Sequence, residues 1–365
     1  MFEEMGSLTM QMGARIPAPA HDLAYQLQQR GMLFPCLLGH RVMRLIAGKR
    51  IQVDEDAVVR VRRRYDELLA RDLENVRQGL YDKELLFQFP FVDYLKAAPS
   101  LLADFPRTLR RLWRGDFQDL PDRVALERYP DYYRRNFHWQ TDGYLSRRSA
   151  NIYDVGVEFL FLGAADVMRR QVIPPVSRFI REEGDDLRLL DVACGTGRML
   201  KQLAVAHPTL RYYGLDLSPY YLQHARELLA DVEDLSLIAD RAEAMPFRDD
   251  YFDVVTSVYM FHELPKKVRR EVYAEMWRVL RPGGLLVIED SAQQSESGEL
   301  AFFLGRFSED FHEPFHRGYM VDDIGAGLEA QGFVDVQTAP CFVSKVVTAR
   351  KPAGAVSKAA AQRSS

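Results

Sequence analysis

Residues 189–197 read Leu-Leu-Asp-Val-Ala-Cys-Gly-Thr-Gly, and this stretch decides the fold. An apolar segment, Arg188 to Ala193, runs into a turn with two glycines, and a helical pattern follows from Gly197 to Ala206. Gly195 and Gly197 have no Cβ, so the backbone can turn sharply and approach a ligand closely. Because the turn leads into a helix N-terminus, the free N–H groups favour a negatively charged ligand group. The stretch therefore predicts a buried strand, a ligand-binding loop and a helix.

A carboxylate at the end of the next predicted strand supports this interpretation. Asp216 follows the apolar segment Arg211 to Leu215 and lies about 20 residues beyond Gly197. In a doubly wound sheet this spacing places the carboxylate beside the glycine turn, where it can accept both hydroxyls of a ribose. A dinucleotide-binding loop would need a third glycine where the chain has Leu200. We therefore expect a nucleoside ligand with a small zwitterionic arm rather than NAD or FAD.

The alternation of short apolar runs and helical patterns continues downstream and predicts a parallel sheet with crossover helices. Further strands are expected over 235–239, 252–259, 284–289, 333–338 and 342–349, with helices over 219–229, 266–280 and 321–331. Only Ala339-Pro340-Cys341 joins the last two strands, which is too short for a crossover helix. That pair should therefore be antiparallel.

The upstream part of the chain has a different character, with helical patterns separated by Pro and Gly. Helices are expected over 54–78, with Asp54 as N-cap, and over 99–114. The helical stretch 151–183 should divide into two helices at Pro174 and Pro175. We expect a helical cap or accessory domain over 1–150, an α/β domain over 151–350, and a disordered tail over 351–365.

Composition excludes several classes of function. The chain has 365 residues, and 48 basic against 52 acidic side chains give a net charge of −4, so a nucleic-acid partner is not expected. Cys36, Cys194 and Cys341 are far apart, which argues against disulfides and a cysteine-based zinc site. The N-terminus is acidic where a signal peptide is basic, and no apolar run reaches the ~20 residues that span a bilayer. We expect a cytoplasmic protein without membrane contact, whose N-terminal helices can cap the sheet or pair two chains as a homodimer.

Several motifs resemble the class I S-adenosylmethionine (SAM) dependent methyltransferases, and are closest to the ubiquinone- and menaquinone-biosynthesis type. They occur in order as the glycine loop Asp191–Gly197, the acidic Asp216, and the stretches 239–247, 252–264 and 278–284. Ala193 stands where the family loop has its first glycine. Residues 1–130 show no such resemblance.

The resemblance implies an α/β fold: a Rossmann-like seven-stranded sheet, mostly parallel with an antiparallel last strand, and here an N-terminal helical extension. It implies SAM as cofactor and methyl transfer to a small-molecule acceptor, with Asp240 and Ala242 holding the adenine. We expect the cofactor to be held by the glycine loop and the strand ends that follow it, namely Asp191, Ala193, Cys194, Gly195, Thr196, Gly197, Asp216, Leu217, Ser218, Asp240, Arg241, Ala242, Val258 and Tyr259.

Aromatic and amide residues are dense between positions 129 and 153, just before the expected sheet. Aromatic faces can stabilise a sulfonium, so this stretch is a candidate cover for the site. We hypothesise that Tyr153 contacts the cofactor, that His138 and Tyr144 are catalytic, and that the acceptor is bound by Asn136, Phe137 and Gln140. The alternative is that these side chains only join the helical extension to the sheet.

Three histidines downstream are further candidates. His262 follows the fourth strand and can act as a general base for an oxygen or nitrogen nucleophile, or can be a supporting or helix-capping residue. His312 and His316 flank Glu-Pro-Phe, which is not the HExxH spacing of a zinc site, so no metal is expected. We expect this segment to shape the acceptor site through His312, Phe315 and Tyr319.

Two other functions remain open at this point. The same fold can consume SAM by displacement or elimination on its aminobutyrate arm, as a lyase or cyclase that releases methylthioadenosine. A non-catalytic SAM-binding protein would show the same loop and carboxylates. The acceptor, and whether its carbon, oxygen or nitrogen is methylated, are left open by the sequence.

Overall fold

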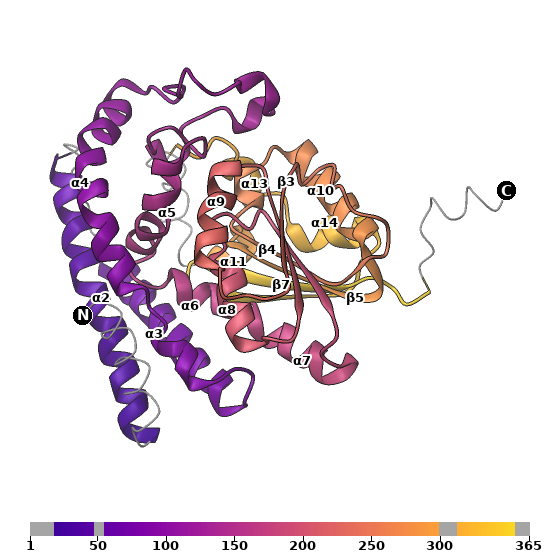
Figure 1. The fold of residues 1–365 in the computed structure, drawn as a ribbon. Coiled ribbons are helices and arrows are strands. Elements are labelled where there is room, and N and C mark those ends of the chain that lie inside the picture. The colour runs from indigo at the N-terminus through magenta and orange to yellow at the C-terminus, as the bar shows by residue number, and fades with distance from the viewer. Residues whose placement is uncertain (1–17, 47–54, 299–311, 355–365) are drawn as a thin grey trace.

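The structure is a computed structural model that describes residues 18–46, 55–298 and 312–354. Its centre is a seven-stranded sheet of order β3-β2-β1-β4-β5-β7-β6 (Figure 1). Strands β1 to β5 pair in parallel, and β7 is antiparallel to both β5 and β6. This confirms the expected fold class. The strands are β1 (Arg188–Val192), β2 (Arg211–Asp216), β3 (Leu235–Ala239), β4 (Phe252–Val258), β5 (Leu280–Ser291), β6 (Val334–Cys341) and β7 (Ser344–Arg350).

Helices cover both faces of the sheet because successive strand residues point to opposite sides. In β1, Leu189 joins the core under α7, α8 and α9, whereas Leu190 joins the core under α10 and α14. The first layer comprises α7 (Ile173–Glu183), α8 (Arg198–Ala206) and α9 (Pro219–Leu228), and the second α10 (Lys266–Val279) and α14 (Ile324–Gln331). The sheet is therefore buried between two helical layers, and its strand ends are left to form a site.

The N-terminal helices form a further group beside this three-layered part (Figure 1). They are α2 (Ala18–Ile46), α3 (Glu55–Arg77) and α4 (Phe91–Arg114), followed by α5 (Arg147–Leu160) and α6 (Ala165–Arg170), which lie between them and the sheet. Short turns η1 (Lys83–Phe87), η2 (Leu126–Arg128), η3 (Asp131–Tyr133) and η4 (Phe137–Trp139) connect the helices. Residues 129–146 thus reach the strand ends as irregular chain.

A buried ion pair fastens this extension to the rest of the molecule. Asp72 of α3 accepts a hydrogen bond from Arg170 of α6 at 2.6 Å and one from the Tyr25 hydroxyl of α2 at 2.5 Å. Both charged side chains are almost fully buried, at 0% and 4% exposure. Loss of one partner would leave the other charge buried and uncompensated, so the pair fixes α2 and α3 against α6.

The structure corrects several element boundaries. Helix α4 begins at Phe91, and Pro99 lies inside it rather than at its start, because packing of α4 on α5 outweighs the local helix-breaking effect of proline. The stretch 151–183 forms three helices, not two. The first break follows Leu160, where Leu162 and Gly163 take positive φ, and Pro174 and Pro175 occupy the first turn of α7, where no intrahelical N–H bond is lost.

Two further boundaries differ near the C-terminal end. Residues 339–341 belong to β6, and the turn to β7 is made by Phe342, with a φ of 58°, and Val343. Lys351, expected in the tail, is fully buried and donates to Asp250 at 2.6 Å. The predicted N-cap Asp54 and the rest of the tail beyond residue 354 lie outside the described residues.

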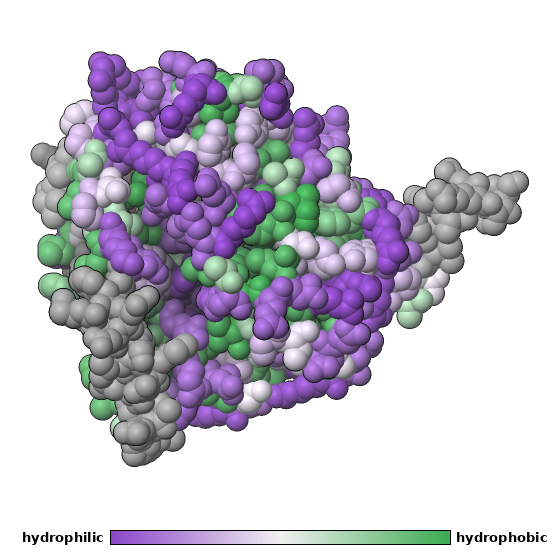
Figure 2. Space-filling model, viewed as in Figure 1, coloured by the Kyte–Doolittle hydropathy of each residue, from purple (hydrophilic) through white to green (hydrophobic). Residues whose placement is uncertain are grey.

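The surface of the N-terminal helices carries exposed apolar side chains. Leu23, Leu27, Phe34 and Leu38 of α2 are each more than half exposed. Figure 2 shows a mostly hydrophilic face with apolar side chains at its left edge and in an area near its centre. The expected homodimer through these helices stays a prediction. Over the described ranges, no helix combines the length and apolar character that a membrane crossing requires.

Candidate active site

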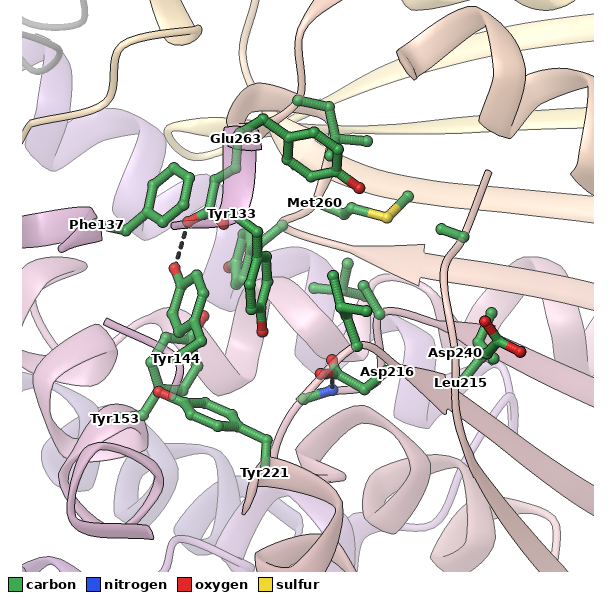
Figure 3. A pocket seen from close by; sticks show the side chains of 18 residues that line it. Tyr133, Phe137, Tyr144, Tyr153, Leu215, Asp216, Tyr221, Asp240, Met260 and Glu263 are labelled. Atoms are coloured by element: carbon green, nitrogen blue, oxygen red, sulfur yellow. Dashed lines mark hydrogen bonds between the residues drawn. The ribbon is translucent and has the colours of Figure 1, made fainter. Parts of the chain in front are cut away.

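A pocket of about 770 Å³, open mouth included, lies at the carboxyl ends of the central strands. This edge of the sheet is where open α/β sheets bind their ligands. One side, here called the sheet wall, is made of Ala193, Gly195, Leu215, Asp216, Leu217, Asp240, Ala242 and Val258. The opposite side, the cap wall, is made of Tyr132, Tyr133, Phe137, Tyr144 and Tyr153 (Figure 3). Tyr221 of α9 and the segment after β4 complete the lining with Tyr259, Met260, Glu263 and Leu264.

The glycine loop takes backbone conformations that depend on small residues. Gly195 and Gly197 have φ of 54° and 82°, and Ala193 also has a positive φ, of 59°. A Cβ on Gly197 would lie 2.8 Å from Leu229 Cδ1, so glycine is needed for the close approach of α8 to α9. Ala193 has a Cβ in the left-handed region, which is a strained position for a residue other than glycine. Backbone groups of this loop therefore reach the pocket with little side chain in the way.

Asp216 ends β2 and lies against the glycine loop (Figure 3). Its carboxylate accepts the N–H of Gly195 at 2.9 Å and the N–H of Ser218 at 2.7 Å. Burial raises the pKa of Asp216 to about 6, although the two backbone N–H groups oppose the rise. Each oxygen keeps a further lone pair, so the carboxylate can accept the two hydroxyls of a ribose. The arrangement fits a nucleoside.

Four of the predicted cofactor residues support the loop rather than line the pocket. Asp191 accepts the Thr256 hydroxyl at 2.8 Å and links β1 to β4, and burial raises its pKa to about 7. Thr196 donates to Asp154 of α5 at 2.9 Å. The Cys194 side chain is buried in the core beside Gly214. Gly197 is the N-cap of α8.

Ser218 and Arg241 also lie outside the pocket lining. Ser218 caps α9 by accepting the N–H of Tyr221, and its hydroxyl donates to the carbonyl of Tyr144 at 2.6 Å. It therefore ties the sheet wall to the cap wall. Asp240 and Ala242 line the pocket next to Asp216, and the N–H of Asp240 donates to the Asp216 carbonyl at 3.2 Å.

Tyr259 follows β4 with a φ of 56°. Its ring stacks on Phe161 at 5.3 Å, and the Arg169 guanidinium lies 5.5 Å from the ring centre. The ring thus lies between Phe161, which follows α5, and Arg169 of α6, and it lines the pocket beside Val258.

The cap wall is a cluster of mutually packed rings. Tyr144 lies 5.4 Å from both Phe137 and Tyr221, and Tyr153 lies 5.4 Å from Tyr221. Burial raises the pKa of each of these tyrosines, so the phenols are neutral at physiological pH. Neutral aromatic faces in a desolvated pocket attract a cationic group.

Glu263 of η5 (Phe261–Glu263) closes the end of the pocket beside the cap wall (Figure 3). It accepts the Tyr144 hydroxyl at 2.5 Å, and His138 Nε2 lies 3.2 Å from the same oxygen. Burial alone would lower the pKa of His138, but the hydrogen bond to Glu263 and the charges of Glu313 and Glu263 raise it overall. Two predicted catalytic residues, Tyr144 and His138, therefore meet on one carboxylate.

His262, the third predicted catalytic residue, lies deeper. Its Nδ1 is 2.6 Å from Asp290, and the side chain does not line the pocket. Burial opposes the charged imidazole, but the carboxylates of Asp290 and Glu313 raise the pKa of His262 to about 10. Because Asp290 also accepts the N–H of Phe261 at 2.6 Å, the pair holds η5 in place.

The predicted acceptor residues divide between pocket and scaffold. Phe137 lines the pocket, and Gln140 donates to the Tyr221 hydroxyl at 3.1 Å behind the rings. Asn136 is fully buried and donates to the carbonyls of Asp119 and Gln140, both at 3.0 Å. It shapes the chain rather than the pocket.

The segment 312–319 contributes no side chain to the pocket lining. His312 stacks on Phe117 at 4.6 Å, and burial lowers its pKa to about 4. Phe315 lies under the Arg135 guanidinium at 5.0 Å. Tyr319 is fully buried and donates to the Ser291 carbonyl, which makes it a core residue. Nowhere in the described ranges do His, Cys, Asp and Glu side chains gather as a metal site would require.

Several lining residues were not singled out from the sequence: Tyr132, Tyr133, Leu215, Tyr221, Met260, Glu263 and Leu264. Two signals were available. Tyr132 and Tyr133 belong to the aromatic stretch before the sheet, and Glu263 is the neighbour of His262. The side of η5 that faces the pocket depends on the turn after β4, which no local pattern reveals.

Comparisons with known proteins agree with this geometry. Residues 189–284 match the family model described as a methyltransferase domain. Demethylmenaquinone methyltransferase of Staphylococcus aureus (strain JH9) is 36% identical over 107 residues, which are 29% of this chain and 44% of that protein. The protein of strain Newman gives the same values. The chain thus spans less than half the length of the curated relatives it matches.

A solved structure, an O-methyltransferase family protein from Burkholderia thailandensis, shares the fold with a TM-score of 0.50. The likeness covers 72% of each chain at 17% sequence identity. Residues 189–284 are thus similar to a methyltransferase domain, and the seven-stranded sheet to which they contribute is the fold expected for a class I SAM-dependent methyltransferase.

Proposed function

We propose that the protein transfers a methyl group from SAM to a small-molecule acceptor inside this pocket. One observation carries the proposal: the nucleoside-type carboxylate Asp216 and the carboxylate Glu263 line the same pocket, with the rings of the cap wall between them (Figure 3). A pocket with a cofactor end and a separate acid–base end suits a two-substrate reaction. The names of the matched relatives, which are methyltransferases, support the same reaction class.

The residues of the sheet wall suit SAM. Asp216 would accept hydrogen bonds from the ribose hydroxyls, and Asp240 and Ala242 would border the adenine. The backbone N–H groups of the loop at Gly195 would face the amino-acid part of SAM. When bound, SAM supplies a methyl group made electrophilic by the neighbouring sulfonium. Tyr144 and Tyr153 offer aromatic faces toward that positive charge.

The chain itself contributes position and exclusion of water. Residues 132–153 cover the strand ends, so two bound molecules would be held in contact with little solvent between them. Holding reactants in a near-attack arrangement removes much of the entropic barrier of a bimolecular reaction. We propose on this basis that residues 1–150 act as a cap domain on a catalytic domain spanning 151–350.

The test is incubation of the full chain with SAM, alone and with a panel of phenols, amines and carbon acids. S-adenosylhomocysteine should form only when an acceptor is present. Methylthioadenosine formed from SAM alone would instead indicate a lyase or cyclase. Calorimetry that detects neither SAM nor S-adenosylhomocysteine binding would contradict both enzymatic functions.

A matched pair of variants ties the activity to the pocket. Asp216→Asn removes the charge that would face the ribose, whereas Asp231→Asn removes an exposed carboxylate that is paired with Lys201 and lies outside the pocket lining. Transfer should be lost in the first variant and kept in the second. Equal activity of the two would separate the reaction from this site.

A further inference from the structure

A chain of acid–base groups leads from the pocket into the protein. His138 lies between two carboxylates, with Nε2 3.2 Å from Glu263 Oε1 and Nδ1 3.3 Å from Glu313 Oε1. Glu263 lines the pocket, whereas Glu313 is fully buried behind it. Beyond Glu313, His262 Nε2 is 4.0 Å away and carries Asp290 on its other nitrogen. The pocket is thus connected to buried groups that can hold a proton.

The backbone is strained where it presents this imidazole. His138 and Trp139 both take positive φ, of 53° and 59°, a backbone conformation that is strained for residues other than glycine. Arg111 of α4 holds the conformation by donating to the Trp139 carbonyl at 3.0 Å and to Asp119 at 3.0 Å. A buried arginine therefore stabilises a conformation that a simple connecting loop would not need.

Glu313 is an unusual buried carboxylate. Among the described residues none makes a hydrogen bond to either of its oxygens, and its side chain is 0% exposed. Burial raises its pKa to about 7, although the charges of His262 and His138 oppose the rise. A carboxylate in such surroundings binds and releases a proton near neutral pH.

The lining restricts the acceptor that these groups can serve. Of the described residues that line the pocket none is Lys, Arg or His, and three are carboxylates: Asp216, Asp240 and Glu263. An acceptor that arrives as an anion would be repelled. The rings of the cap wall, together with Tyr221 and Tyr259, offer flat faces that favour a planar molecule. A neutral planar hydroxyl compound, which ionises only after it has bound, meets both conditions.

We propose, resting on the proposed methyl transfer, that Glu263 and His138 act together as the base that deprotonates a phenolic or enolic hydroxyl of the acceptor, with Glu313 as the next proton carrier. The O–H electron pair stays on oxygen and forms the new O–C bond to the methyl group. The C–S bond breaks with its electron pair on sulfur. The proton passes to Glu263 and on to the His138 imidazole, and Glu313, whose Oε1 lies 3.3 Å from the other ring nitrogen without a hydrogen bond, takes it once the two groups align.

Neighbouring groups do not replace this pair. The Tyr144 hydroxyl donates to Glu263, and burial and the Glu263 charge raise its pKa, so it orients the carboxylate and does not accept the proton. His262 is engaged by Asp290 and lies outside the lining. The titratable groups that face Glu263, His138 and Glu313 from the surrounding elements are Tyr133, Tyr144, Tyr153, Asp216, His262, Asp290, His312 and His316.

The test uses three variants of the full chain. Glu263→Gln keeps the shape of the side chain and can still accept the hydrogen bond of the Tyr144 hydroxyl, but it cannot take up a proton. His138→Asn removes the imidazole, and Asn tolerates positive φ. Glu243→Gln is the matched control, because Glu243 accepts the Tyr132 hydroxyl at 3.0 Å in the same way but lies outside the pocket lining.

The first readout needs no turnover. The protein saturated with S-adenosylhomocysteine is titrated at about pH 8, above the pKa of Glu313, with a chromogenic phenol whose free pKa is about 9, and the absorbance of the phenolate is followed. The parent and Glu243→Gln should bind it as phenolate, and Glu263→Gln and His138→Asn should bind it as neutral phenol. Absence of saturable binding, neutral phenol in the parent, or phenolate in all four proteins would overturn the proposal.

The second readout is catalysis with a phenolic acceptor. A lost general base should lower kcat about 100-fold or more in Glu263→Gln and His138→Asn, with the KM for SAM unchanged. Unchanged kcat in both variants would also overturn the proposal. Calorimetry with S-adenosylhomocysteine separates the two hypotheses: if the parent does not bind it, the proposed methyl transfer fails, whereas normal binding with unchanged phenol ionisation rejects only the base.

Discussion

The two sides of the pocket are built in different ways. The sheet wall consists of strand ends and backbone. Its hydrogen bond from the Gly195 N–H to the Asp216 carboxylate joins residues of one strand–helix–strand unit, β1-α8-β2. The cap wall consists of aromatic side chains on irregular chain, held by contacts from distant segments such as Ser218 to the Tyr144 carbonyl. The sheet wall is therefore suited to the nucleoside of the cofactor, and the cap wall to its positive charge and to a particular acceptor. Mutations on either side test this division.

The largest effect on stability is expected at the buried ion pair that joins α3 to α6. Arg170→Met should leave Asp72 buried without its cation and reduce the free energy of unfolding by about 3–5 kcal/mol. Lys201→Met, which removes a partly exposed ion pair with Asp231, should cost less than 1 kcal/mol. Urea denaturation measures both. Equal losses would show that the buried pair does not fix the cap.

On the sheet wall, Asp216→Asn should weaken SAM binding about 100-fold, because hydrogen bonds to a charged group contribute about 1.5–3 kcal/mol each. Isothermal calorimetry gives the affinity, and Asp231→Asn serves as control. A change below threefold would show that the ribose is held elsewhere.

Because of the raised pKa of Asp216, we expect protein stability and SAM affinity to depend on pH in opposite directions. Its pKa is about 6 in the folded protein against an ordinary value of 3.8, so the folded state binds the proton more tightly. Asp216 therefore adds about 3 kcal/mol to the free energy of unfolding at low pH. This contribution is fully present below about pH 4 and is lost as the pH rises through about 6. SAM affinity should instead fall as the pH drops below about 6. Unfolding and calorimetry from pH 4 to 8, each compared with Asp216→Asn, isolate both effects; parallel trends would contradict this assignment.

On the cap wall, Tyr144→Ala and Tyr153→Ala should each weaken SAM binding about tenfold, which corresponds to the loss of one desolvated aromatic face. Tyr129→Ala is the matched control, since Tyr129 stacks on Tyr133 at 5.8 Å but lies outside the lining. Native affinity and native turnover in both Tyr144→Ala and Tyr153→Ala would show that these rings only join the extension to the sheet.

The smallest effect is expected in the glycine loop. Ala193→Gly relieves the strain of a positive φ, which stabilises the folded protein, and adds conformational freedom to the unfolded chain, which has the opposite effect. The first effect is the larger, so the free energy of unfolding should rise by about 0.5 kcal/mol. Thermal unfolding measures the change. A loss of more than 1 kcal/mol would show that the alanine methyl group packs favourably enough to outweigh the strain.

The difference between the walls also explains what sequence could predict. The glycine turn, Asp216 and the antiparallel last pair of strands follow from local patterns, because β1 and β2 each end beside the residues that line the pocket. Pro99 inside α4 and the break after Leu160 could not be predicted, since packing against other elements decides them. The same holds for His262 and Glu263: both are adjacent in sequence, and only the turn after β4 determines that Glu263 faces the pocket.

The most direct test of the account is a crystal structure of the full chain with S-adenosylhomocysteine. We expect the ribose hydroxyls to donate to the Asp216 carboxylate and the sulfur to face the rings of Tyr144 and Tyr153, on the side of Glu263. A ligand bound elsewhere, or a pocket without it at saturating concentration, would contradict the account.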